Sequence, residues 1–224
     1  MFSIELNNVN TLSKIINLIL SENNIEFKCI FDFNKHCMKW VFNCPNDEKI
    51  YKYELKFKID ESVERKSIDY YTFDIRSFYE IFCNSNNTSL KINLDDSYIL
   101  INEVIIKMYK LDCVSVSIQK HSYENIIDFN LFSVLQQYKN FSSLHIVTTK
   151  EYVILIFKNG SEFYSKSYKI NYIKFGNIFK TEFTNKEISK LLTLNDLNFM
   201  MYTNDKLKFK HVNEYWTFNV ISVI

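Results

Sequence analysis

The sequence contains no alanine, one proline and two glycines in 224 residues. The glycines, Gly160 and Gly176, stand alone, so no glycine-rich loop for cradling a phosphate is present. The four histidines stand in no motif that would supply a Ser–His–Asp or Cys–His arrangement. We therefore expect a binding or scaffold protein that is not an enzyme.

The five cysteines are odd in number and scattered, which is typical of reduced thiols. Cys29, His36, Cys37 and Cys44 are the best candidates for metal ligands. Zinc sites favour about two to four residues between paired ligands, and that spacing is absent here. Strand alternation would instead place Cys37 on one face of a strand. The sequence thus predicts no metal and no cofactor.

Long apolar runs are also missing. No stretch approaches the roughly 18 apolar residues of a membrane span, and the start MFSIELNNVN lacks a basic segment followed by an apolar core. We expect a chain that is neither secreted nor inserted in a membrane.

The chain has ample material for a hydrophobic core and an even charge balance. Hydrophobic residues make up 47%, and 27 Lys and Arg face 26 Asp and Glu. Near-neutrality argues against a tail that coats nucleic acid, but it permits a basic patch on one face. The abundance of Asn, Lys, Ile, Phe and Tyr favours an AT-rich genome as the source.

Hydrophobic periodicity divides the first half into many strands and two short helices. Helices are predicted over Val9–Leu20 and, after a capping Asp74, over Ile75–Cys83. Asp60–Lys66 reads as a charged loop. Strands are predicted at Phe2–Asn7, Ile25–Phe31, Cys37–Cys44, Ile50–Ile59, Asp69–Phe73, Ser89–Leu94, Tyr98–Asn102 and Val104–Tyr109.

The second half repeats this order. A helix follows Asn130, with Leu131, Phe132, Leu135 and Tyr138 inside, and Thr184 with Glu187 forms a capping box for Asn185–Leu192. An Asn159-Gly160 turn predicts a hairpin. Strands are predicted at Tyr123–Phe129, Leu144–Thr149, Tyr152–Phe157, Phe163–Ile170, Phe179–Phe183, Leu197–Tyr202, Lys206–His211 and Tyr215–Val223.

Two short helices in each half are too few to cover both faces of a sheet. The predicted fold class is therefore α+β, with two similar domains of antiparallel sheet and two short helices each. The predicted domains are 1–109 and 123–224, joined by a connector at 110–122.

The element order, the repeat and the connector resemble the sliding clamp family, most closely the PCNA type. The likeness rests on FSIELNNVNTLSKIINLIL at 2–20, TFDIRSFYEIFCNSNNTSLKIN at 72–93, the connector KMYKLDCVSVSIQKHSY at 107–123 and the closing strands at 197–224. The base composition and short length suggest a divergent viral member. The resemblance implies a homotrimeric ring that encircles double-stranded DNA and tethers a DNA polymerase, in the nucleus or a cytoplasmic viral factory.

The resemblance also assigns residues to surfaces. Helices would line the hole and meet phosphates through Lys14, Arg76, Lys139, Lys186 and Lys190. This set is thinner than in the family, because Ser13, Leu20, Tyr79 and Phe82 stand at positions that are basic there. A solvated helix face is the plainer interpretation of any one of these lysines.

The connector would be the docking strap for partner peptides, with Leu111, Val116 and Ile118 in the pocket wall and Phe42 and Cys44 adjoining. Its plainer interpretation is an edge strand with a buried apolar face. Subunits would join head to tail through Val104–Tyr109 and Phe163–Ile170, with contacts from Val104, Ile106, Met108, Phe163 and Tyr168.

Three other functions remain open. The chain could be a viral late transcription factor with a clamp-like fold that acts at promoters. It could be a virus-encoded module that binds host proteins and no nucleic acid. A two-domain enzyme with an unrecognised site ranks last.

Overall fold

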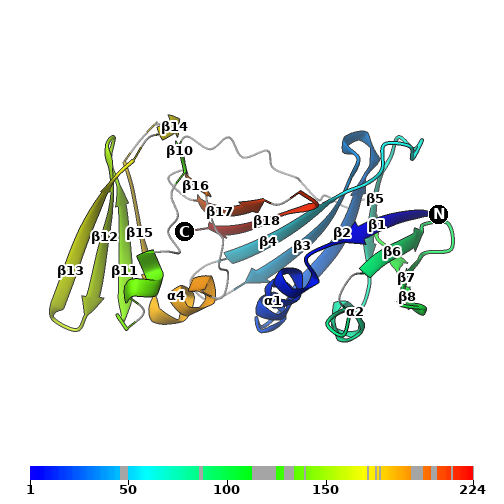
Figure 1. The fold of residues 1–224 in the computed structure, drawn as a ribbon, viewed down its shortest axis with the longest axis horizontal. Coiled ribbons are helices and arrows are strands. Elements are labelled where there is room, and N and C mark those ends of the chain that lie inside the picture. Colours follow the sequence, from blue (N-terminus) through cyan, green and yellow to red (C-terminus); the bar gives the residue numbers. More distant parts are fainter. Residues whose placement is uncertain are drawn as a thin grey trace. The chain divides into compact units, whose positions relative to one another are not determined.

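The computed structural model describes the chain except residues 46–49, 86–87, 113–124, 129–133, 139, 171, 175, 177, 193–198, 203–205, 213 and 224. The chain divides into two compact units (Figure 1). Unit 1 comprises Met1–Gln119 and Val212–Asn219, and unit 2 comprises Lys120–His211 and Val220–Ile224.

Unit 1 contains two antiparallel sheets and two helices, α1 (Val9–Leu20) and α2 (Ile75–Phe82). One sheet has the order β1-β6-β7-β8, and strands of the second follow the order β4-β3-β2-β5-β9. These strands are β1 (Phe2–Leu6), β2 (Glu26–Asp32), β3 (Cys37–Pro45), β4 (Ile50–Lys58), β5 (Ile68–Thr72), β6 (Thr88–Asn93), β7 (Tyr98–Ile101), β8 (Val104–Lys107) and β9 (Tyr109–Lys110), with a 3₁₀ turn η1 (Phe33–Lys35) after β2.

Aromatic side chains fill the core of unit 1. Trp40 of β3 is fully buried and meets Phe78 of α2 edge-on, with ring centroids 4.9 Å apart. Phe57 of β4 approaches the same indole at 4.9 Å. Helix α2 therefore packs on the face of the sheet that carries Trp40 and Phe57.

The predicted strand Val104–Tyr109 is two strands in different sheets. β8 pairs with β7, whereas β9 pairs with β5. Met108 lies between them, with its side chain 1% exposed and its N–H donating to the Ser97 carbonyl at 2.7 Å. Burial of this side chain turns the chain from one sheet into the other.

Unit 2 also contains antiparallel sheet, with strand orders β13-β12-β11-β15 and β14-β10-β16-β17. Helix α4 (Asn185–Leu192) follows β15, and η2 (Gln136–Tyr138) follows a short helical segment at Val134 and Leu135. The strands are β10 (Asn125–Asp128), β11 (Ser143–Thr148), β12 (Tyr152–Asn159), β13 (Glu162–Lys169), β14 (Tyr172–Lys174), β15 (Phe179–Thr184), β16 (Phe199–Tyr202) and β17 (Lys206–Val212).

The predicted hairpin is present in unit 2. Strands β12 and β13 pair up to Asn159 and Glu162, which leaves Gly160 and Ser161 as the turn. Gly160 has φ of +62°, a conformation that glycine adopts without steric cost.

The closing strand β18 (Trp216–Val223) differs from the predicted domain division, because its first residues belong to unit 1. The Trp216 indole N–H donates to the Asn7 carbonyl at 3.1 Å, and the Phe218 ring stacks on Tyr53 with centroids 6.2 Å apart. These contacts anchor a segment from the end of the sequence in the unit formed by its beginning. None of the described helices is long and apolar enough to cross a membrane.

Candidate nucleic-acid interface

Helix α1 exposes Lys14 because its apolar face is buried. Leu12, Ile16 and Ile19 are all 0% exposed, and their spacing places Lys14 on the opposite face. Asn8 precedes the helix in the left-handed conformation, and its side-chain oxygen accepts a hydrogen bond from the Thr11 hydroxyl at 3.0 Å. The helix thus begins at a defined residue and presents one cation to solvent.

Helix α2 presents Arg76 in the same manner. The Asp74 carboxylate accepts from the N–H groups of Arg76 and Ser77 at 3.0 and 3.3 Å. The Ser77 hydroxyl donates to it at 2.6 Å. These bonds, the Ser77 hydroxyl first, lower the pKa of Asp74 below its usual 3.8. Because α1 and α2 lie side by side (Figure 1), Lys14 and Arg76 stand on neighbouring helices.

Helix α4 of unit 2 exposes Lys186. The predicted capping box is present: the Thr184 N–H donates to Glu187 at 2.7 Å, and the Glu187 N–H donates to the Thr184 hydroxyl at 3.4 Å. Lys190 lies on α4, and Lys139 lies outside the described residues.

These exposed cations suit weak contact with phosphates. A lysine ammonium or an arginine guanidinium on a solvated helix face attracts any phosphate and reads no base. Each carries an exposed side chain on a long, mobile stem, so its contribution is salt-dependent. Acidic Glu80 and Glu187 share the same helices, which keeps the local positive field modest.

The described residues offer no metal centre, and their buried thiols are not activated. No group of three His, Cys, Asp or Glu side chains among them could hold a metal ion. Cys29, Cys37 and Cys44 are buried, and burial raises the pKa of the Cys29 and Cys37 thiols. A buried, protonated thiol is a poor metal ligand and a poor nucleophile.

Two exposed sheet edges carry large apolar side chains. β8 ends its sheet in unit 1, and β13 ends its sheet in unit 2. Val104 is 44% exposed on β8, and Phe163 is 73% exposed on β13. Ile105 and Tyr164, which the sequence interpretation did not select, are 66% and 44% exposed. An exposed edge with apolar side chains invites another strand.

Other predicted interface residues are placed differently. Ile106 and Met108 are buried in unit 1, and Tyr168 is half-buried. Ile106 faces the core, and Met108 is buried where the chain passes from β8 to β9, so the interface assignment of Ile106 and Met108 through their side chains is corrected.

The predicted docking surface is only partly described. Leu111 is half-buried, and its N–H donates to the Tyr70 carbonyl at 2.8 Å, which continues the pairing of β9 with β5. Val116 and Ile118 lie outside the described residues.

Phe42 and Cys44 are 0% and 2% exposed, and Phe42 packs against Phe27 at 4.8 Å. Their assignment to a docking pocket is corrected, because alternation along β3 turns both toward the core.

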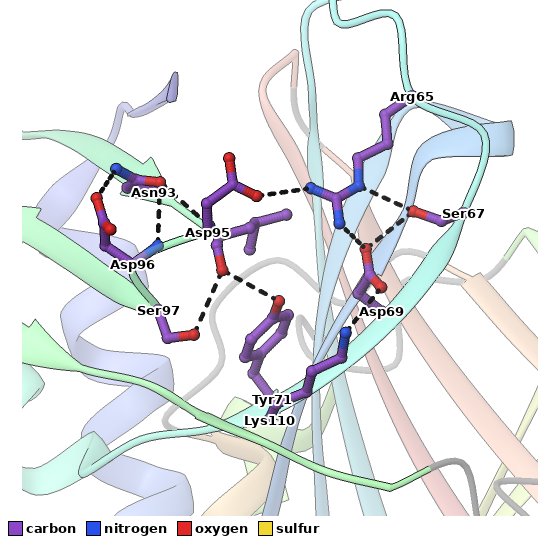
Figure 2. Close-up of polar contacts among 10 residues, drawn as sticks. Arg65, Ser67, Asp69, Tyr71, Asn93, Asp95, Asp96, Ser97 and Lys110 are labelled. Atoms are coloured by element: carbon purple, nitrogen blue, oxygen red, sulfur yellow. Dashed lines mark hydrogen bonds and ion pairs between the residues drawn. The ribbon is translucent and has the colours of Figure 1, made fainter.

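The sequence interpretation missed a polar network at the start of the connector. It treated Asp60–Lys66 as a charged loop without partners elsewhere in the chain. Arg65 contacts Asp69 at 3.2 Å and Asp95 at 3.8 Å, and its Nε donates to the Ser67 hydroxyl at 3.1 Å (Figure 2). The Ser67 hydroxyl donates to Asp69 at 2.9 Å, and Lys110 lies 3.9 Å from the same carboxylate. The network ties the β6–β7 turn and β9 to β5.

No protein-family model matches the sequence, and no curated protein matches it. The structure does resemble solved proteins. One is the crystal structure of Proliferating Cellular Nuclear Antigen from Entamoeba histolytica, with a TM-score of 0.66 and 12% sequence identity over 99% of this chain and 98% of that chain. The chain has the DNA-clamp fold. This result confirms the predicted fold class.

Proposed function

We propose that the chain is a sliding-clamp-like processivity factor that encircles or cradles duplex DNA without sequence specificity. The observation that carries the proposal is the likeness in fold to a PCNA over 99% of the chain. A partial match could reflect a shared domain, whereas this one includes both units and the closing strands. No step of chemistry on DNA is required, since retention comes from topology and weak phosphate contacts.

Lys14, Arg76 and Lys186 support the proposal as exposed cations on three helices. In the proposed complex each neutralises a phosphate as a mobile charge, together with Lys139 and Lys190. Because the set is thin, DNA is held weakly, and weak contacts are compatible with sliding.

Assembly into a homotrimer completes the proposal. The exposed edges of β8 and β13 support head-to-tail pairing between copies, which gives a closed ring when the rotation closes. A DNA polymerase or other replication proteins would then dock on the connector around Leu111, Val116 and Ile118. We place the protein in the nucleus or in a cytoplasmic viral factory, in keeping with a divergent viral source.

The test compares retention on circular and linear duplex DNA over a range of salt concentrations. A closed ring stays on a circle and runs off a linear molecule. Lys14→Gln, Arg76→Gln and Lys186→Gln together should flatten the log–log salt dependence, by roughly 0.9 for each phosphate that is no longer neutralised. Binding should weaken equally on any sequence. A matched control replaces Lys91, Lys150 and Lys180, which are exposed outside the helices.

Two other outcomes would replace the proposal. Equal retention on both DNA forms with a strong sequence preference would favour a promoter-binding late transcription factor. An absence of retention in low salt would favour an interaction module that binds proteins and no nucleic acid. The small number of exposed cations on the helices is compatible with that alternative.

A further inference from the structure

Four lysines gather on the face of the unit 1 sheet opposite α2. Lys39 of β3 stands directly across from Lys56 of β4. Lys58 lies two residues beyond Lys56, and Lys28 lies two residues from Ile30, the β2 partner of Lys39. Diagonal neighbours of this kind are about 7–8 Å apart. We call Lys28, Lys39, Lys56 and Lys58 the lysine cluster.

Strand alternation fixes which face the cluster occupies. Trp40 and Phe57, which pack with each other and with Phe78 of α2, alternate with Lys39, Lys56 and Lys58 along β3 and β4. Successive side chains of a strand point to opposite faces. The lysine cluster therefore points away from the helix.

The cluster lacks carboxylate partners. Among the described residues, no Asp or Glu oxygen lies within 4.0 Å of its ammonium groups, whereas Lys35 pairs with Asp32 and Lys52 pairs with Glu54. Of the carboxylates on this face, Asp32 and Glu54 already have cationic partners, and Glu26 lies at the start of β2, two residues before Lys28. Like charges directly across a strand pair are destabilising, so a bound anion would relieve a repulsion between Lys39 and Lys56.

The ammonium groups are accessible while their stems cover the sheet. Lys56 and Lys58 are exposed, Lys28 and Lys39 are half-buried, and Ile30 is 1% exposed. Lysine stems can lie on apolar surface and keep the charged group in water. The cluster is therefore a positive surface.

The surroundings of the cluster favour an acidic peptide over nucleic acid. Single-stranded nucleic acid binds through aromatic stacking as well as charge, and the described residues of β2 to β5 place one aromatic side chain, Tyr70, on this face. Duplex DNA held along the helices would lie on the other side of the sheet.

An extended peptide fits the spacing. Alternate residues of a strand are about 6.6 Å apart, and Lys56 and Lys58 are themselves alternate residues. A segment with Asp or Glu at every second position could therefore set one carboxylate on Lys56 and the next on Lys58. Lys39 lies across the strand pair within reach of the same carboxylates.

We propose that the lysine cluster binds an extended acidic segment of a partner protein. Three observations support this proposal: the cross-strand register of the lysines, their lack of carboxylate partners among the described residues, and the scarcity of aromatic side chains on this face. The proposal goes beyond the clamp function and does not depend on it, since any scaffold with this sheet would present the same surface.

The test measures fluorescence anisotropy of a short labelled peptide of alternating Glu and Ser, with a Gln and Ser peptide as the neutral probe. The intact chain should bind the acidic peptide in low salt and release it as salt rises. The double variant Lys39→Gln, Lys56→Gln should bind about tenfold more weakly, which corresponds to about 1.4 kcal/mol over two charges. Lys14→Gln with Arg76→Gln removes the same charge from the helices and should leave peptide affinity unchanged.

A labelled DNA duplex measured on the same variants separates this proposal from the clamp proposal. Duplex binding should fall in the helix variant and persist in the Lys39, Lys56 variant. Failure of the intact chain to bind the acidic peptide, or equal weakening in both variants, would overturn the acidic-segment proposal. So would selective loss of duplex binding in the Lys39, Lys56 variant. Thermal unfolding checks that each variant is folded. If the double variant is not folded, Lys58→Gln, a single change of an exposed residue, replaces it and should also weaken peptide binding.

Discussion

At the scale of single residues, Asp74 decides where α2 begins and therefore where Arg76 points. Asp74→Ala removes the acceptor for two backbone N–H groups, and losing such a cap costs about 1 kcal/mol. We expect a matching drop in the free energy of unfolding, measured with urea at neutral pH. The control is Glu80→Ala, a change of an exposed residue on the same helix. It should change the free energy of unfolding by no more than about 0.5 kcal/mol.

The same cap should be visible in the pH dependence of stability. The folded-state pKa of Asp74 lies below its usual value of 3.8, chiefly because of the hydrogen bond from Ser77. A depressed folded-state pKa gives stabilisation that is full above the unfolded-state value and is lost as pH falls through the folded-state value. The stability difference between the intact chain and Asp74→Asn should therefore shrink as pH falls below about 4. A difference that stays constant down to about pH 2 would contradict this role of the carboxylate.

At the scale of elements, the short helical segment before η2 tests whether unit 2 has its own core. Leu135 is 1% exposed although it sits in a helix of few residues. Leu135→Ala should lower the free energy of unfolding by about 2–5 kcal/mol, as for other buried leucines. Gln136→Ala, at an exposed neighbour, should have little effect. A change within about 0.5 kcal/mol for Leu135→Ala would show that this segment does not pack into a core.

Periodicity predicted the elements well because it reports which side chains of a strand or helix share a face. It found the buried stripe of α1 and the capping box of Thr184, both set by residues close in sequence. The assignment of Phe42 to a docking surface came from the family resemblance, and Phe42 lies in the core. Periodicity also joined β8 and β9, because nothing in local spacing indicates that Met108 turns the chain into a second sheet.

At the scale of the whole molecule, the sequence was least informative about long-range contacts. The hydrogen bond from Trp216 to Asn7 spans 209 positions, and no local pattern indicates it. The same holds for the ion pair between Arg65 and Asp95, which come from different parts of the chain. The lysine cluster likewise exists only through the register of three strands, since its members are spread from Lys28 to Lys58.

The oligomeric state is the whole-molecule property that most directly tests ring closure. We predict that exposed edge residues on β8 and β13 hold the copies together, with Ile105 and Phe163, at 66% and 73% exposed, as the largest apolar contributors. Ile105→Lys and Phe163→Lys each place a charge on an edge strand, which discourages strand addition. Light scattering coupled to size exclusion should report three times the 26.9 kDa chain mass for the intact protein and one chain mass for either variant.

The matched control for ring closure is Tyr152→Lys. This side chain is also exposed, at 39%, but it lies on β12, which pairs on both sides within its sheet. The control should keep the mass of the intact protein, because a lysine there leaves both edges unchanged. A Tyr152→Lys variant that dissociates as readily as the edge variants would assign the dissociation to general surface charge. An intact protein that is a single chain at every concentration would contradict the ring, and a trimer that survives both edge substitutions would place its contacts elsewhere.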